Sequence, residues 1–556
     1  MVTKKHKITG IAFILIISGL FAFKTIPNDK YFEIQKNLDI FATLFKEVNT
    51  YYVDEIDPSK LMKTGVDAML KSLDPYTNYI PEEDLADYRT MTTGQYGGIG
   101  ATIGNRNGNT LVIMPYEGFP AYKAGLKIGD EIMAINGIAL KAKTTTQVSK
   151  LLKGAPNTPL TLKIKRVGKP DFEVTLKRQT IQIDNVPFYD MVTNDVGYIQ
   201  LTDFTQGASR EVRKALHKLK AKGAKKVVLD LRGNPGGLLS EAINISNLFI
   251  NRNSEVVKTK GKVKEINQTY RALNRSYDTK IPLVVLTDKR SASASEIVAG
   301  VIQDYDRGVL VGQNTFGKGL VQTTRSLAYN AKLKVTTAKY YIPSGRCVQA
   351  LDYSQHNADG SAKKFPDSLK TAFKTKNGRT VYDGNGLAPD VLTKEKDYSP
   401  IVNSLIDKGL LFDYANIYAS KHATIASAQE FKLTDTEYNA FVNWVKKQKY
   451  DYETQVENGL KGLEKTAKEE QYYKSIRNQL STLKAKVSHN KEQDLVTYKK
   501  DIKHLLELEV ASRYYLHKGL TKVSFREDAE LKAALKLFEN MNDYKQALTI
   551  TKKAKR

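Results

Sequence analysis

The middle of the chain contains two strongly apolar runs, each leading into a segment of helix-forming composition, and this repeat constrains the fold most. The runs are KKVVLDL, which precedes SEAINISNLFI, and PLVVLTDK, which precedes SEIVAGVIQDY. Short apolar runs rich in β-branched residues are typical of buried strands, and their alternation with helices predicts α/β layering. We therefore predict an α/β core over residues 186–396.

The rest of the chain divides into three segments of different character. Residues 31–90 carry apolar side chains at helical spacing, interrupted at Asp57-Pro58 and Asp74-Pro75, which predicts a small helical unit. Residues 91–183 consist of short β-rich runs separated by glycine turns, and residues 397–556 have a helical, lysine-rich pattern. A chain of 556 residues can form several cores, so we predict a multidomain α/β protein.

Residues 1–24 have the pattern of an export signal. Lys4, Lys5 and Lys7 precede an apolar run from Ile8 to Phe23, which is short for a full membrane span. No A-x-A cleavage site follows, so a cleaved signal peptide and an uncleaved membrane anchor both stay open. We expect an exported protein of a bacterial periplasm or cell envelope, with inner-membrane anchoring left open.

The charge and the cysteine count exclude some functions. A net charge of +26 indicates a lysine-rich surface, and nucleic acid or an anionic membrane surface is the alternative partner. We expect no nucleic-acid partner, because neither a zinc-finger spacing nor an RNP-like strand motif occurs. Cys347 is the only cysteine, and the histidines show no H-E-x-x-H pair. We therefore predict neither an intramolecular disulfide nor a metal site.

The stretch VGQNTFGKGLVQ places Gly312, Gly317 and Lys318 at the spacing of a phosphate-binding P-loop. Such a loop next requires a serine or threonine for magnesium and the start of a helix. This chain has Gly319 there, followed by residues 320–321 with the pattern of a strand. Lys318 is therefore expected to serve another chemistry.

Upstream of Lys318 lies SASASEIVAG, in which Ser293 and Glu296 have the spacing of a helix capping box. A serine at the start of a helix also lies beside backbone amides and the positive end of the helix dipole. These groups would stabilise an oxyanion formed by attack on a carbonyl. The capping role and a catalytic role are compatible, and both stay open.

A serine hydroxyl needs a base, and His217 and His356, the histidines of the α/β region, lie in no recognisable motif. Lys318 can be that base if apolar surroundings lower its pKa. Gln322 projects to the same side in an extended chain and could orient the amine. The glycine turn of LRGNPGG can direct backbone N–H groups at one point. The spacing alone leaves a Ser/Lys hydrolase and a set of ordinary turns both open.

Five separated motifs, in the same order, resemble those of the C-terminal processing (tail-specific) serine peptidases. They are LDLRGNPGGLL, SASASEIVAG, TFGKGLVQ, KYYIPSGRCVQ and GLAPDV, and the resemblance runs from about Tyr51 to Val391. It departs modestly at Tyr76-Thr77 and at Ala388, which weakens inference about the N-terminal segment only.

The resemblance implies a crotonase-like α/β core with Ser293 as nucleophile, Lys318 as general base and Gln322 as the residue that orients the lysine. It also implies the backbone amides of Ala294 and Gly237 as oxyanion donors. Ser291 and Ser295 are rivals for the nucleophile, and the family spacing to the lysine favours Ser293.

Residues 91–183 resemble a circularly permuted bacterial PDZ domain, through YGGIGATI and PAYKAGLKIGDEIMAING. Such a domain binds a peptide as an added strand and holds its terminal carboxylate on a glycine loop. Here that loop would be Gly97, Gly98, Ile99 and Gly100. Ordinary β-turn glycines are the alternative.

Together these features predict an exported serine endopeptidase that recognises protein C-terminal tails and cleaves through an acyl-enzyme, without a cofactor. Its partners would be proteins or peptides with apolar C-termini, and homo-oligomer formation is left open. The alternative function is a catalytically silent PDZ scaffold of the cell envelope that binds peptides. Ser293, Lys318 and Gln322 argue against the scaffold.

Overall fold

The computed structural model describes residues 28–450, 452–487 and 491–549. The chain divides into two compact units, one ending at Tyr79 and the other beginning at Ile80. The export signal expected in residues 1–24 lies outside the described residues. Across the described part, every helix is too short or too polar to cross a bilayer.

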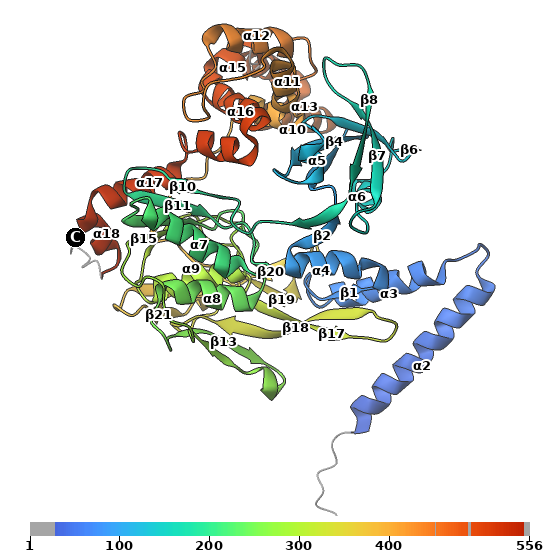
Figure 1. Ribbon diagram of the computed structural model, residues 1–556. Helices are drawn as coiled ribbons and strands as arrows, with labels where there is room; N and C mark the ends of the chain where they lie inside the picture. Colours follow the sequence, from blue (N-terminus) through green and yellow to red (C-terminus); the bar gives the residue numbers. More distant parts are fainter. Residues whose placement is uncertain (1–27, 451, 488–490, 550–556) are drawn as a thin grey trace, which may run out of the picture. The chain divides into compact units, whose positions relative to one another are not determined.

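Within the described residues, the first unit contains two helices, α2 (Asn28–Tyr51) and α3 (Pro58–Lys71) (Figure 1). The Asp57 carboxylate accepts hydrogen bonds from the backbone N–H groups of Ser59 and Lys60, and Pro58 occupies the first helical position. Both features favour a helix start. The Asp57-Pro58 interruption read from the sequence therefore begins a helix. Strand β1 (Asn78–Ile80) spans the end of this unit.

The second unit begins with α4 (Leu85–Thr93) and the β-rich region. Its main sheet has the order β3-β4-β5-β7-β8, with β6 beside β5, and β2 pairs separately with β9. Ile99, Val112 and Leu162 belong to its core. The strands are β2 (Gln95–Gly98), β3 (Ala101–Arg106), β4 (Asn109–Pro115), β5 (Glu131–Ile135), β6 (Ile138–Ala139), β7 (Pro159–Lys165), β8 (Phe172–Lys177) and β9 (Gln179–Gln182), and the helices are α5 (Pro120–Lys123) and α6 (Thr145–Leu152).

A six-stranded sheet of order β10-β11-β12-β15-β16-β23 forms the α/β core and confirms the predicted layering. Only β10 is antiparallel to its neighbour. The strands are β10 (Phe188–Met191), β11 (Val196–Gln200), β12 (Lys226–Asp230), β15 (Leu283–Thr287), β16 (Val309–Gly312) and β23 (Val391–Leu392). One face of the sheet packs against α7 (Ala208–Ala221), α8 (Leu239–Phe249) and α9 (Ala294–Asp304) (Figure 1).

The other face of this sheet is covered by the end of the chain, in α17 (Ala529–Glu539) and α18 (Met541–Ala547). Val284 and Leu286 point to this face, whereas Leu283 and Val285 point to the opposite helices, as the period of a strand requires. Four residues of the two helices complete the layer: Leu531, Ala534, Phe538 and Tyr544. The C-terminal segment is therefore part of the core.

An ion cluster joins the same segment to the turn after β12. Arg232 pairs with Asp230 at 2.6 Å, with Asp528 at 2.7 Å and with Glu530 at 3.1 Å. The Arg232 side chain is one-fifth exposed, so these pairs are screened less than surface pairs. The LRGNPGG motif thus contacts the C-terminal segment through its arginine.

A second sheet contains β13 (Glu255–Gly261), β14 (Thr269–Arg271), β17 (Leu320–Ser326) and β18 (Lys332–Tyr341). In the β17–β18 hairpin, Gln322 lies opposite Thr336 and Thr324 lies opposite Lys334. Two short hairpins follow, β19 (Leu351–His356) with β20 (Ala362–Lys364), and β21 (Ala372–Lys374) with β22 (Thr380–Tyr382).

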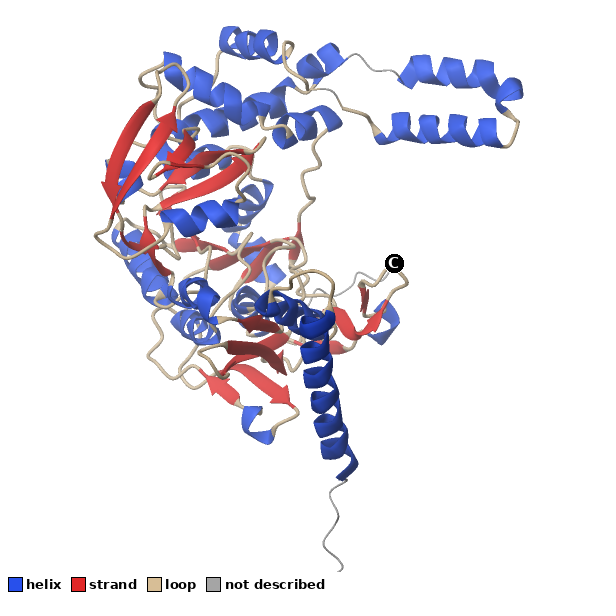
Figure 2. Ribbon diagram, turned by 90° about the vertical axis from the view of Figure 1, so that its right-hand side faces the viewer, coloured by secondary structure: helices blue, strands red, loops and turns tan. Residues whose placement is uncertain are grey.

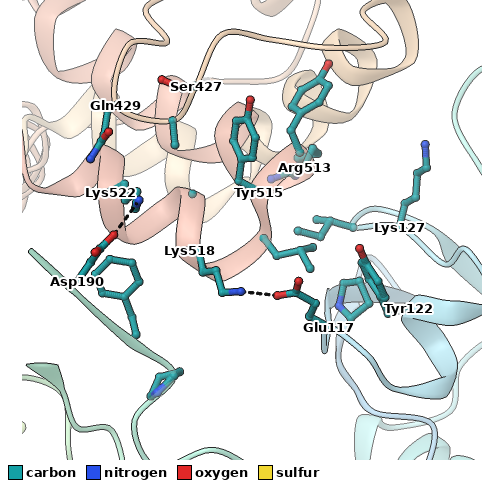
Figure 3. A pocket seen from close by; sticks show the side chains of 18 of the residues that line it. Glu117, Tyr122, Lys127, Asp190, Ser427, Gln429, Arg513, Tyr515, Lys518 and Lys522 are labelled. Carbon is teal, nitrogen blue, oxygen red and sulfur yellow. Dashed lines mark hydrogen bonds and ion pairs between the residues drawn. The ribbon is translucent and has the colours of Figure 1, made fainter. Parts of the chain in front are cut away.

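The C-terminal region is helical, as predicted, and Figure 2 draws it in blue without strands. Its helices before α17 are α10 (Pro400–Asp407), α11 (Leu410–Lys421), α12 (Asp435–Val445), α13 (Gln455–Glu469), α14 (Tyr473–Val487), α15 (Lys491–Thr497) and α16 (Lys499–Ser524). Figure 3 shows α16 where it meets two other regions. Lys518 pairs with Glu117 of the β-rich region and Lys522 pairs with Asp190 of β10. Helix α16 therefore links the C-terminal helices to the β-rich region and to the α/β core.

Replacing Phe538 with alanine should destabilise the core sheet. Phe538 is 1% exposed and packs on Tyr544 with ring centroids 5.8 Å apart, so the substitution leaves a cavity against the sheet. We expect the free energy of unfolding to fall by about 3 kcal/mol, measured by urea unfolding and by hydrogen exchange in β12 and β15. Leu483→Ala, at a residue 45% exposed on α14, is the matched control. Equal stability of the two variants would show that α17 does not support the sheet.

Candidate active site

The residues expected to carry the chemistry line one cavity of about 600 Å³ in the second unit. Ser293, Ala294, Gly237, Lys318 and Gln322 all contribute to its walls. The first two come from the start of α9, Gly237 from the turn after β12, and the last two from the entry into β17. The fold thus brings together three segments that are far apart in the sequence.

Ser293 has an unusual backbone conformation at the start of α9. Its φ of 56° and ψ of −113° lie in a region that L residues rarely adopt, at a cost of about 1–3 kcal/mol. Its N–H donates to Glu296 Oε2 at 2.8 Å, which forms the glutamate half of the expected capping box. Its carbonyl accepts from Tyr340 Oη at 3.2 Å. These contacts hold a strained residue at the cavity wall, as is common at functional sites.

The two rival serines are buried and hydrogen-bonded. Ser291 Oγ donates to the Leu231 carbonyl at 2.8 Å, and Ser295 Oγ donates to the Asn234 carbonyl at 2.9 Å. Both residues are fully buried. These two hydroxyls tie α9 to the glycine turn after β12, whereas Ser293 is the serine of this motif that lines the cavity.

The Glu296 carboxylate joins two segments of the site. One is the turn at Ser293 before α9, the serine turn, and the other is residues 313–319 between β16 and β17, the lysine loop. Oε1 accepts from Thr315 Oγ1 at 2.5 Å and from the Gly317 N–H at 2.8 Å. Oε2 accepts from the N–H groups of Ser293 and Lys318, each at 2.8 Å, so these nitrogens cannot be farther apart than twice that distance. Burial raises the pKa of Glu296, and the hydrogen bonds act in the opposite direction.

The sequence indicated Glu296 only as a cap of α9. Its local role was visible in the S-x-x-E spacing, but its contacts with the lysine loop span about twenty residues and leave no periodic signal. Glu296 contacts the backbones of both Ser293 and Lys318, whereas the sequence indicated only its capping position three residues after Ser293.

The lysine loop cannot serve as a P-loop. A side chain at Gly319 would lie 2.9 Å from the Cys347 sulfur and from the Gln349 nitrogen, so a serine or threonine has no room there. Strand β17 begins at Leu320, where a P-loop would begin a helix. Gly317, at φ 86°, has a backbone conformation that favours glycine. Both sequence arguments against a nucleotide loop are confirmed.

Gln322 lies on β17 just after a bulge in the pairing with β18. Its Nε2 donates to Thr336 Oγ1 at 3.1 Å, which fixes the plane of the amide. Gln322 and Lys318 line the same cavity. The fold is therefore compatible with the expectation that Gln322 and Lys318 project to the same side.

The glycine turn after β12 packs directly on the Ser293 backbone. A Cβ on Gly236 would lie 2.7 Å from the Ala292 oxygen and 2.8 Å from the Ala294 nitrogen, and one on Gly237 would lie 2.6 Å from the Phe204 oxygen. Only glycine fits at either position. Gly236 donates its N–H to Asn234 Oδ1 at 2.9 Å, so its amide has a structural role. The sequence had drawn attention to Gly237 alone.

The expected carboxylate loop of the β-rich region is shorter than the sequence suggested. Gly97 and Gly98 belong to β2 and pair with Thr180 and Gln179 of β9. Ile99 and Gly100 alone connect β2 to β3, with Ile99 2% exposed and Gly100 at φ 73°. Side chains at Gly97 would meet backbone at 2.1 Å, so strand packing accounts for that glycine.

No group of three His, Cys, Asp or Glu side chains within the described residues is arranged to hold a metal ion. Cys347 is partly buried beside β18, and burial raises the pKa of its thiol. Burial of a neutral thiol is typical of a structural cysteine.

Three segments of the chain match known families. Residues 195–355 match peptidase family S41, residues 114–166 match the PDZ domain, and residues 401–538 match a domain described as a probable PDZ-protease C-terminal helical domain. These matches fall on the α/β core, the β-rich region and the C-terminal helices.

Two curated relatives are bacterial proteins. A carboxy-terminal-processing protease of Bartonella bacilliformis is 37% identical over 57% of this chain and 73% of its own length. A probable CtpA-like serine protease of Staphylococcus aureus is 38% identical over 56% of this chain, which spans 63% of that relative. Among solved structures, the photosystem II D1 C-terminal processing protease is 27% identical, with a TM-score of 0.35, over 64% of this chain and 92% of that one.

The similarity to the Bartonella protease covers more than two-thirds of that protein, and the family matches agree with it. The chain therefore belongs to the carboxy-terminal-processing proteases of peptidase family S41.

Proposed function

We propose that the protein is a serine endopeptidase in which Ser293 is the nucleophile and Lys318 the general base. One observation carries the proposal. Ser293 and Lys318 line the same cavity, and their backbone nitrogens share one oxygen of the buried Glu296 carboxylate. A nucleophile and its base must lie within hydrogen-bond reach during the reaction, and a shared buried anchor keeps their backbones close.

In the proposed reaction, Ser293 Oγ attacks the scissile carbonyl carbon while its proton passes to the neutral Lys318 amine. The negative charge develops on the carbonyl oxygen, beside the first amides of α9 at Ala294 and the amide of Gly237. The C–N bond then breaks, and Lys318 returns the proton to the leaving nitrogen. Water attacks the ester by the same route and regenerates Ser293 Oγ–H. This sequence of steps requires no cofactor.

Gln322 orients the base in this proposal. Because its Nε2 already donates to Thr336, its Oε1 is the half of the amide directed to accept from another group. An amine that donates to this oxygen keeps its lone pair directed elsewhere, toward the serine proton. Gln322 is therefore a positioning residue.

Glu296 positions both partners. A buried carboxylate that accepts four hydrogen bonds is stabilised by them, and the loss of any one leaves a buried polar group unsatisfied. A movement of the lysine loop away from the serine turn would therefore break hydrogen bonds to Glu296.

The β-rich region would recognise protein tails. A peptide would add as a strand, with its terminal carboxylate at the Gly97, Gly98, Ile99 and Gly100 segment and an apolar last side chain in the adjoining core. The short Ile99-Gly100 turn limits the amides available to that carboxylate. Substrates would thus be exported proteins with apolar C-termini, in keeping with the signal pattern of residues 1–24. We propose the domain limits expected from the sequence, 31–90, 91–183, 186–396 and 397–556, with α17 and α18 of the last segment packed on the core sheet.

The Ser293→Ala variant should lose cleavage of a protein with an apolar C-terminus while it stays folded. The loss should exceed a thousandfold, because the nucleophile is removed. A fluorophosphonate probe should label the unchanged protein at Ser293, faster as the pH rises, since only the neutral Lys318 amine accepts a proton. Peptide mapping of the labelled protein gives the site. Full activity of the folded Ser293→Ala variant would refute the proposal, and tail binding without cleavage by the unchanged protein would favour the scaffold.

The Glu296→Gln variant should test whether Glu296 positions Ser293 and Lys318 without contributing to substrate binding. Its amide presents an NH₂ group to backbone donors, so at least one of the four hydrogen bonds is lost. We expect probe labelling of Ser293 to slow by about a hundredfold or more, with kcat falling and KM nearly unchanged. Circular dichroism checks that the variant is folded. Glu530→Gln, which alters the separate Arg232 cluster, is the control. Normal labelling of folded Glu296→Gln would show that the carboxylate does not position the site.

A further inference from the structure

The cavity that contains Ser293 and Lys318 has a second lysine in its wall, Lys334. Lys334 lies on β18 opposite Thr324 and two residues from Thr336, the partner of Gln322. Because side chains two apart in a strand project from the same face, Lys334 and Thr336 project from the same face of the hairpin. The lysine amine therefore belongs to the same wall as the Gln322 amide.

Lys334 has no ion pair or side-chain hydrogen bond to any other residue in the described ranges. Its side chain is partly buried, and burial lowers the pKa of its amine with no opposing carboxylate. Taking a charged amine out of water without a partner is unfavourable. A lysine left in this state at a cavity wall is typical of a group that acquires its partner from a ligand.

The surroundings of Lys334 favour an anion. Helix α4 covers this end of the cavity, where Tyr88 Oη and Thr324 Oγ1 lie 2.7 Å apart. Asp203 is the only carboxylate among the residues that line the cavity. Asp203 adjoins Phe204, which bridges to Gly237 at the glycine turn, and so belongs to another wall. An approaching carboxylate therefore meets the Lys334 amine at the β17–β18 wall, where neither strand contributes a carboxylate to the cavity.

We propose that Lys334 binds a carboxylate of the peptide substrate and so determines which tails are cleaved. The carboxylate is either an Asp or Glu side chain or the free C-terminus of a peptide whose end does not occupy the segment of residues 97–100. Lys334 and Thr336 are two residues apart on β18, which is about 7 Å in a strand. In an extended peptide the same distance separates residues two apart, so we expect the bound carboxylate about two residues from the bond next to the Lys318 amine. This inference rests on the proposed function, because it assigns a substrate group to the same cavity.

The test compares three peptides of one apolar sequence: a free C-terminal acid, the C-terminal amide, and an amide with one internal Asp. The unchanged protein should cleave a carboxylate-bearing peptide with a kcat/KM about tenfold above the plain amide. A preference for the first peptide that Lys334→Gln removes identifies the terminus, and a preference for the third that it removes identifies a side chain. Lys334→Gln should abolish the preference, mainly through KM, and Lys334→Arg should restore most of it. Lys339→Gln removes an exposed lysine from the same strand and should keep the preference.

Binding to a catalytically dead protein separates this inference from the proposed function. In the Ser293→Ala background, calorimetry should still show tighter binding of the carboxylate peptide, and adding Lys334→Gln should remove the difference. Such binding without any cleavage by the unchanged protein would refute the peptidase and keep the Lys334 site. An equal preference in the Lys334→Gln and Lys339→Gln variants, or no preference in the unchanged protein, would overturn the inference.

Discussion

The site depends on the hydrogen bonds that the buried Glu296 carboxylate accepts. A charge fully removed from water is unfavourable unless hydrogen bonds surround it, and here four donors from two loops do so. The bond from the Ser293 N–H stabilises the strained Ser293 backbone, and the three bonds from residues 315–318 hold the loop of Lys318 against the start of α9. One side chain therefore couples a helix start, a loop and the entrance of a strand.

The sheet beneath the site explains how that arrangement stays rigid. Helix α9 packs on one face of the parallel strands, and the end of the chain packs on the other. The turn after β12 is held from two directions, by Ser291 and Ser295 on the side of the site and by Arg232 on the side of the C-terminal segment. The C-terminal helices thus support the glycine turn that contacts Ser293.

Much of this arrangement could be predicted from the sequence. The apolar runs KKVVLDL and PLVVLTDK predicted the layered core. The motifs around Ser293 and Lys318 indicated residues that line one cavity. What could not be predicted depends on contacts between distant segments. The sequence shows Glu296 only as a helix cap and Lys334 only as one lysine of a strand. It shows an apolar face on helix α17, but not that this face packs on the core sheet. Gly97 and Gly98 read as a loop because the pairing of β2 with β9 joins residues that lie far apart.

The most direct test is an experimental structure of the protein with a peptide boronate bound at the cavity. The account predicts a covalent bond from boron to Ser293 Oγ, with Lys318 Nζ within about 3.2 Å of that oxygen. It also predicts that Glu296 accepts from the Ser293 and Lys318 backbones in the same crystal. A boronate bound to Ser293 while the Lys318 loop has left Glu296, with the amine beyond hydrogen-bond reach, would contradict it.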